Sequence, residues 1–305
     1  MILLPENQTN LFGLKEVFNN FVELYNNNNL PNKILISGSK GVGKCTLAYH
    51  LINFILSKGE DFAYDFHTNT INPQNKSFKL TQNKSNPNLI LIDISSEKKK
   101  IEISQIRNMI SNLNKSCLNS KPRFVLIDNV QYLNLNSINA LLKILEEPNN
   151  NIHFILINNN KSILHTLKSR CLEFKIFFTK NESSIVCEKL LGKRVEDIIN
   201  QDLLDYYYTP GKILNLTEFA NENSIDLAKL KLKDFLLLII SKSFYKKNIL
   251  IQDFLLDYFE LFLRKNGNSN NNFYEYFVRQ YSNVKKYNLD EESFFMEFKE
   301  KLLYV

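Results

Sequence analysis

Short apolar runs alternate with helically spaced apolar residues through the first half of this chain, and this alternation constrains its fold more than any other feature. Between the first two runs, Leu47, Leu51 and Ile55 recur every four residues, as residues on one face of a helix do. A second such stripe extends from Ile138 to Leu145. The apolar runs are 33–37, 88–92, 124–127, 154–157 and 172–176. Strands separated by helices predict an α/β fold in which a parallel sheet carries helices on both faces.

The pattern changes near Thr179. From there the apolar residues keep helical spacing and no convincing strand is visible, which predicts a helical second half. The aromatic stripe of Phe254, Tyr258 and Phe262 indicates a core or a subunit interface rather than a ligand site. The expected elements are helices at 181–191 and 196–208, a break at 209–212, and a helical block at 225–305 interrupted by a polar loop at 265–272.

Two further features of the first half predict local structure. The polar stretches 26–29 and 69–85 have the composition of surface loops. Ser104 precedes a stripe of helically spaced apolar residues, so we expect it to cap that helix.

The composition is that of a globular protein. A chain of 305 residues suits two or three domains. Its longest apolar run is far shorter than a membrane span and no secretory signal is visible, so we expect a cytoplasmic protein with no membrane partner. The net charge of +6 permits contact with nucleic acid but does not demonstrate it, because a specific footprint needs charge clustered on one face.

The four cysteines predict free thiols. Cys45, Cys117, Cys171 and Cys187 lie far apart, and none forms a C-x-x-C pair. A zinc site needs ligands at short spacings, so neither zinc nor another resident metal is expected.

The strongest local motif lies between the first expected strand and the helix that follows it. Residues 38–44 match the G-x-x-x-x-G-K spacing of a phosphate-binding loop. Glycines let such a loop turn its N–H groups towards an anion, and the helix N-terminus adds positive potential. Lys44 is expected to reach the outer phosphates. The candidate loop residues are Gly38, Gly41, Val42, Gly43 and Lys44. The alternative is a glycine-rich turn that holds no nucleotide.

The magnesium-binding part of this motif is incomplete. The residue after Lys44 is Cys45 where Ser or Thr is expected, and Thr46 follows one place later; a thiol is a poor ligand for a hard cation. Asp128, directly after the third strand, can hold magnesium through water, although Asp at a strand end is also a common turn former. Asn129 follows it, and an amide cannot act as a general base. We therefore expect ATP binding that is weak or does not lead to hydrolysis.

Two later segments carry a family resemblance. Residues 137–148, SINALLKILEEP, and Ser169–Arg170–Cys171 resemble the clamp-loader branch of the AAA+ ATPases. Supporting segments occur in the order typical of that family: Leu11–Gly13 near the N-terminus, Leu30–Pro31 before the first strand, Asn158 or Asn159 as a first sensor, and Thr209–Lys212 as a second sensor with Lys212 where Arg is usual. The resemblance covers about residues 5–216.

The resemblance implies an architecture and a role for Arg170. The family's subunits form an open ring, and Arg170 matches the arginine finger that acts on a neighbour's nucleotide, which makes it the expected catalytic residue in trans. The alternative is a surface arginine paired with Glu173. Lys212 is expected at the nucleotide. The implied domains are an AAA+ P-loop domain at 1–178, a helical lid at 179–222 and a helical collar at 223–305.

Within this family, two kinds of DNA polymerase III subunit compete. The catalytic tau/gamma type needs an intact nucleotide site and usually carries a cysteine module. The delta-prime type tolerates a damaged nucleotide site, so Cys45 and Asn129 favour delta-prime here. The resemblance then implies tau/gamma and delta subunits, the sliding clamp and primed DNA as partners. More distant alternatives are a stand-alone P-loop switch or kinase, and a scaffold without nucleotide function.

Overall fold

A computed structural model describes residues 4–94, 100–115, 119–147, 151–247, 249–266, 271–287 and 289–302. The chain divides into two compact units. The first contains residues up to Val186 together with Thr209–Gly211, and the second contains 187–208 and the residues from Lys212 onwards. Cys117, Pro148 and residues 267–270 of the expected polar loop lie outside the described residues.

The first unit is built on a five-stranded parallel sheet with the order β2-β3-β4-β1-β5. Its strands are β1 (Lys33–Ser37), β2 (Leu89–Ile92), β3 (Arg123–Ile127), β4 (Ile152–Asn158) and β5 (Leu172–Lys175). In register, Ile34 of β1 lies opposite Ile155 of β4 and Leu172 of β5. All residues of β3 and β4 are buried, which explains why they read as continuous apolar runs rather than alternating ones. The predicted parallel sheet is confirmed.

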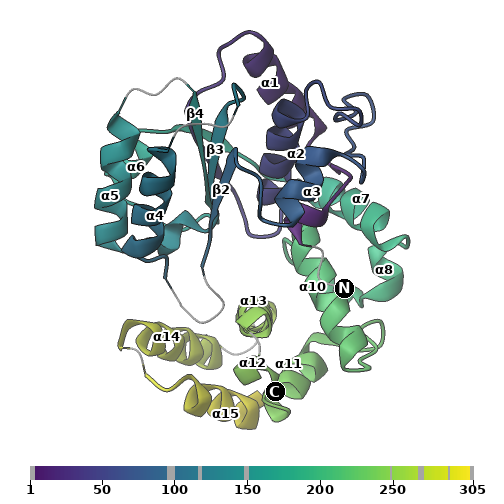
Figure 1. Cartoon of the computed structure of the whole chain (residues 1–305). Helices are drawn as coiled ribbons and strands as arrows, with labels where there is room; N and C mark the ends of the chain where they lie inside the picture. Colours follow the sequence, from purple (N-terminus) through teal and green to yellow (C-terminus); the bar gives the residue numbers. More distant parts are fainter. Residues whose placement is uncertain are drawn as a thin grey trace. The chain divides into compact units, whose positions relative to one another are not determined.

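Helices cover both faces of this sheet (Figure 1). One face carries α1 (Lys15–Asn26), α2 (Lys44–Leu56) and α3 (Lys76–Gln82), with the short turn η1 (Pro5–Asn7) packed against α2. The other carries α4 (Ile103–Leu113), α5 (Leu135–Glu146) and α6 (His165–Lys168), and η2 (Val130–Tyr132) precedes α5. The predicted stripe of Leu47, Leu51 and Ile55 is buried in α2, as are Leu141 and Leu145 in α5.

Two local predictions in this unit are wrong. The stretch 69–85 is not a continuous loop, because α3 lies within it. The Asn75 side chain accepts a hydrogen bond from Phe78 N at 2.7 Å, which caps the helix, and Phe78 is buried. In α4, the cap is Glu102 rather than Ser104, which lies in the first turn. The Glu102 backbone N–H donates to Gln105 Oε1 at 2.9 Å, as part of a capping box.

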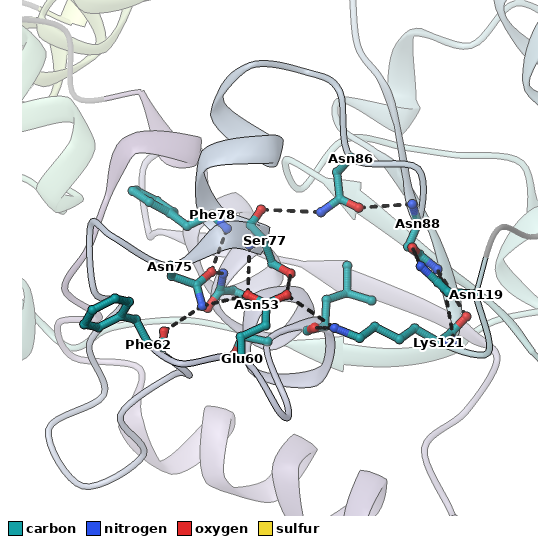
Figure 2. A network of polar contacts seen from close by, with 12 residues as sticks. Asn53, Glu60, Phe62, Asn75, Ser77, Phe78, Asn86, Asn88, Asn119 and Lys121 are labelled. Carbon is teal, nitrogen blue, oxygen red and sulfur yellow. Dashed lines mark hydrogen bonds and ion pairs between the residues drawn. The ribbon is translucent and has the colours of Figure 1, made fainter.

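A polar network holds the segment between α2 and β2 to the sheet (Figure 2). The Glu60 carboxylate accepts hydrogen bonds from Ser77 N (3.0 Å), Ser77 Oγ (2.6 Å) and Asn75 Nδ2 (3.2 Å), and pairs with Lys121 Nζ at 3.3 Å. Just before β2 and β3, the side-chain amides of Asn88 and Asn119 bond each other reciprocally at 2.9 and 3.0 Å. These contacts join α3 to the starts of both strands.

The second unit is helical in its described residues. It contains α8 (Val195–Ile198), α9 (Gln201–Leu204), α11 (Leu232–Ser241), α12 (Phe244–Lys247), α13 (Ile249–Asn266), α14 (Asn271–Tyr287) and α15 (Glu291–Leu302). Two further helices, α7 (Lys180–Leu191) and α10 (Pro210–Glu222), begin in the first unit and continue into the second. The predicted stripe of Phe254, Tyr258 and Phe262 is buried in one apolar cluster with rings from α14 and α15. The prediction that this stripe belongs to a core is confirmed.

The region 196–212 differs from the sequence prediction. The expected helix 196–208 is two short helices, because Asn200 interrupts it: its side chain accepts from Asp202 N at 2.9 Å, and its backbone N–H donates to Leu227 O at 3.0 Å. The expected break at 209–212 ends early, since α10 begins at Pro210. Proline suits the first position of a helix, where its missing N–H would have no intrahelical partner.

Among the described residues, no helix is both long and apolar enough to cross a bilayer. Cys45, Cys171 and Cys187 are free thiols.

Candidate nucleotide site and exposed arginine

The loop between β1 and α2 has the conformation that its glycines were expected to provide. Gly41 and Gly43 adopt left-handed φ values of 89° and 88°, and Gly43 is the residue that precedes α2. A Cβ on Gly38 would lie 2.2 Å from the carbonyl oxygen of Ile176, so only glycine fits there. Val42 is buried and anchors the loop. The loop thus ends at the N-terminus of a 13-residue helix, a favourable place for a phosphate group.

Lys44 is held inside this loop. Its side chain is buried, and Nζ donates to Gly38 O at 2.9 Å and to Ser39 O at 2.7 Å. Burial lowers the pKa of Lys44 to about 8, while the nearby Asp128 carboxylate opposes this shift. The ammonium therefore remains mainly charged at neutral pH, and the loop carbonyls fix its position.

The start of α10 packs against the outside of the loop. Thr209 Oγ1 donates to Lys40 O at 2.7 Å, and Gly211 N donates to Gly41 O at 2.8 Å. A Cβ on Gly211 would lie 2.6 Å from Gly41 Cα, so the close approach needs a glycine on each side. This contact was not predicted from the sequence, which assigned 209–212 only as a break and a sensor. Here the segment also supports the backbone of the loop.

Cys45 and Asp128 are neighbours in the fold. The Cys45 thiol lies beside the Asp128 carboxylate, and the Asn129 backbone N–H donates to Asp128 Oδ1 at 2.7 Å. Burial, followed by the effect of Asp128, raises the pKa of Cys45 well above its usual value, so the thiol stays protonated. Burial and then the charge of Asp93 raise the pKa of Asp128 to about 6. Asp128 thus lies beside the residue that follows Lys44, and its expected role at a magnesium ion stays a prediction.

Asn129 is fixed by three side-chain hydrogen bonds. Its Nδ2 donates to Asp93 Oδ1 at 2.9 Å, and its Oδ1 accepts from Asn159 Nδ2 at 2.7 Å and from Gln131 Nε2 at 3.3 Å. Of the two candidates for the first sensor, Asn159 makes this contact, whereas Asn158 Nδ2 donates to Lys161 O at 2.9 Å. Every polar atom of the Asn129 amide group has a partner within the protein.

Asp93 and Gln131 are site residues that the sequence analysis missed. Asp93 directly follows β2, as Asp128 follows β3, and the carboxyl ends of parallel strands share one edge of the sheet. That shared position was the available signal for Asp93. Gln131 lies in η2 between Val130 and Tyr132, and no sequence pattern marked it as a site residue.

Arg170 lies at the amino ends of the strands, opposite the carboxyl ends that carry the loop. It precedes β5, whose first residue Leu172 is in register with Ile34, four residues before the loop begins at Gly38. Four residues of strand rise correspond to ~13 Å along the strands, so Arg170 lies well away from the loop of its own chain.

The contacts of Arg170 correct the partner expected for it as a surface arginine: the ion pair is made with Glu146 rather than Glu173. Nε donates to Glu146 Oε1 at 2.9 Å, Nη2 bonds the same carboxylate, and Nη1 donates to Thr166 O at 2.8 Å. Glu173 pairs with Lys168 at 3.0 Å, so the Arg170–Glu173 pairing is wrong. The Arg170 side chain keeps 34% exposure and borders an open cavity of about 790 Å³.

Of the two segments that carried the resemblance, the described residues 137–147 lie in and directly after α5, and Ser169–Arg170–Cys171 lies between α6 and β5. The family model described as DNA polymerase III, delta subunit matches residues 13–179, which is more than half of the chain. The chain belongs to this family.

Relatives of this DNA polymerase III family member carry two names. A subunit gamma from Buchnera aphidicola subsp. Schizaphis graminum is 28% identical over 232 residues, covering 73% of this chain and 61% of that protein. A subunit delta' from Buchnera aphidicola subsp. Baizongia pistaciae is 30% identical over 162 residues, covering 50% of this chain and 46% of that protein. The chain thus spans about half to three fifths of the length of these curated relatives.

A solved structure supports the fold of this family member. The DNA polymerase III gamma subunit-related protein of Thermotoga maritima is similar with a TM-score of 0.52 and 15% identity, covering 95% of this chain and 97% of that one. At this identity the similarity concerns the fold, and it confirms the predicted class of a parallel sheet followed by a helical region.

Lys212 belongs to the second unit, where it forms an ion pair with Asp257 of α13. Its expected place at a nucleotide stays a prediction. No group of three or more His, Cys, Asp or Glu side chains suited to a metal ion occurs in the described part of this DNA polymerase III family member.

Proposed function

We propose that this chain is a delta-prime subunit of a DNA polymerase III clamp loader, and that Arg170 serves as an arginine finger for the nucleotide of a neighbouring subunit. The observation that carries the proposal is Asn129. Its amide occupies the position where a catalytic carboxylate is needed, and bonds to Asp93, Asn159 and Gln131 hold it there. A site without that base hydrolyses ATP poorly. The partly exposed Arg170, at the amino ends of the strands, can still stabilise charge on a nucleotide held by a neighbouring subunit.

The proposal includes an assembly. Tau/gamma and delta subunits would complete an open ring that places the sliding clamp on primed DNA, and lysines facing the ring interior would follow the DNA backbone without reading its sequence. We assign residues 1–178 to the AAA+ domain, 179–222 to a lid and 223–305 to a collar. ATP would bind weakly at Gly38–Thr46, with Asp128 and Lys212 near the phosphates, and would not be turned over quickly.

The catalytic tau/gamma subunit is the second candidate. The gamma relative aligns over 73% of this chain, more than the 50% covered by the delta' relative from Baizongia pistaciae, and this favours the second candidate. Against it stand Cys45 and Asn129, since each replaces a group that hydrolysis uses.

ATP turnover by the isolated chain separates the two candidates. We expect turnover at least about 10²-fold below that of a tau/gamma subunit assayed alongside, because the base is missing. Co-purification with tau/gamma and delta subunits is the companion measurement, with the expected result a stable complex. Turnover equal to the tau/gamma control would favour the second candidate, and failure to join the complex would contradict both.

A further inference from the structure

Phosphate-binding loops of this type are expected to hold magnesium beside the phosphates, and this site does not suit that ion. Magnesium demands oxygen ligands in near-octahedral geometry. The residue whose hydroxyl would supply one of them is Cys45, at the second position of α2. Sulfur is a soft ligand, which a hard cation such as magnesium binds poorly.

The side-chain oxygens near this position already accept hydrogen bonds. Asp128 Oδ1 accepts from Asn129 N at 2.7 Å, and Asp93 Oδ1 accepts from Asn129 Nδ2 at 2.9 Å and from Ile94 N at 2.6 Å. Asn129 Oδ1 accepts from both Asn159 and Gln131. Thr46 cannot replace Cys45, because the next residue along an α-helix points ~100° away around its axis.

The groups that bind phosphate without a metal are nevertheless intact. Gly41 and Gly43 keep their left-handed backbone, and α2 begins directly after them. Lys44 is held in place by two loop carbonyls at 2.9 and 2.7 Å, so little ordering is needed when an anion enters. The groups that bind phosphate directly are therefore present, whereas the ligands that would hold magnesium are not.

We infer that this loop binds the phosphates of ADP or ATP without magnesium, so that the ion contributes nothing to nucleotide affinity. The inference rests on the proposed nucleotide site and adds that the nucleotide is bound there without a metal ion. Cys45, at the second position of α2, is the residue that sets this property, and a single oxygen-for-sulfur replacement changes it.

The test is a titration of the whole chain with ADP, followed by calorimetry, once with Mg²⁺ and once with EDTA. We expect the two dissociation constants to agree within about twofold for the natural chain, a difference well under 1 kcal/mol. In Cys45→Ser, the hydroxyl offers oxygen, and Mg²⁺ should tighten ADP binding by about tenfold or more.

Two further variants locate the effect. Cys171→Ser makes the same atomic change outside the loop and should behave as the natural chain. Lys44→Ala should abolish binding under both conditions, which would place the measured binding in the loop. Thermal melts of all three variants establish that each is folded, and the Cys45→Ser and Cys171→Ser replacements differ from the natural chain by one atom type.

Two results would overturn the inference. One is ADP binding to the natural chain that Mg²⁺ strengthens by about tenfold or more. The other is an absence of ADP binding both with Mg²⁺ and with EDTA. Neither result touches the proposed role of Arg170, which depends on a nucleotide held by a neighbouring subunit, so failure here is distinguishable from failure of the proposed function.

Discussion

In our proposal, Cys45 and Asn129 determine how the site around Lys44 can be used. The loop beside them keeps the left-handed glycines Gly41 and Gly43 and leads directly into α2. Cys45 and Asn129 each lack the chemical group that hydrolysis needs: Cys45 has sulfur in place of a hydroxyl oxygen, and Asn129 has an amide in place of a carboxylate. The substitutions change the chemistry of the site and leave its fold in place.

Gly211 supports this loop through steric fit rather than chemistry. In Gly211→Ala the new Cβ would meet Gly41 Cα at 2.6 Å, so the start of α10 or the loop must move. We expect a loss of ~1–3 kcal/mol in the free energy of unfolding, together with weaker ADP binding. Urea denaturation and ADP titration check both effects.

Gly192→Ala is the control for Gly211→Ala. Gly192 has a φ of 69°, so alanine is strained there, but its Cβ would have nothing within 4 Å. The control should lose about 1 kcal/mol and leave ADP affinity unchanged. If both variants weakened ADP binding equally, the contact between α10 and the loop would have no part in nucleotide binding.

At the scale of elements, the segment between α2 and β2 depends on Glu60. Burial alone would raise the pKa of this carboxyl, but hydrogen bonds from Ser77 and the Lys121 charge outweigh it and hold the pKa below its ordinary value. Its stabilising effect is therefore complete at pH values above the unfolded-state pKa. It is lost as pH falls through the lower folded-state pKa.

Glu60→Gln tests this account of the network. We expect the variant to lose ~1–3 kcal/mol at neutral pH, because the amide leaves Ser77 and Lys121 with poorer partners. The difference from the natural chain should shrink as pH falls below the usual range for glutamate. Denaturation curves at several pH values measure it, and Glu16→Gln, on the exposed face of α1, is the matched control. A destabilisation independent of pH would contradict the assigned role of the charge.

The strands could be predicted from the sequence and some helices could not, for a physical reason. β3 and β4 are buried on both faces, so their apolar runs are unmistakable. By contrast, α3 depends on the Asn75 cap and one buried Phe78, and its other residues are mostly polar. Likewise, the division of 196–208 depends on a bond from Asn200 to Leu227, a contact distant in sequence that no local pattern reports.

The candidate site divides in the same way. The Gly38–Lys44 loop and Asp128 follow local spacing, so they were predictable. Two partners of Asn129 were not, because Asp93 and Asn159 follow β2 and β4, which only the folded sheet brings beside β3; Gln131, the third partner, is two residues away in sequence. The link between Gly41 and Gly211 was hidden for the same reason.

At the scale of the whole molecule, we propose different roles for the two ends of the strands. The carboxyl ends carry a phosphate-binding loop with an incomplete catalytic set, and the amino ends carry Arg170 beside an open cavity. Glu146 holds the guanidinium when the chain is alone. A neighbour's phosphate, with its greater charge, would compete for the same donors. Membership of the DNA polymerase III family fits a subunit that acts within an assembly.

ATP turnover of the assembled clamp loader carrying Arg170→Ala is the most direct test of this account. ATP turnover at the one nucleotide site that adjoins Arg170 should fall by about 10³–10⁵-fold. The total turnover of the complex should therefore fall by the fraction that this site contributes, and the complex should still assemble. Arg170→Lys should not restore it, because an ammonium lacks the planar fork. Arg194→Ala, at another exposed arginine, is the control and should leave turnover unchanged. Unchanged turnover in an intact complex carrying Arg170→Ala would contradict the account.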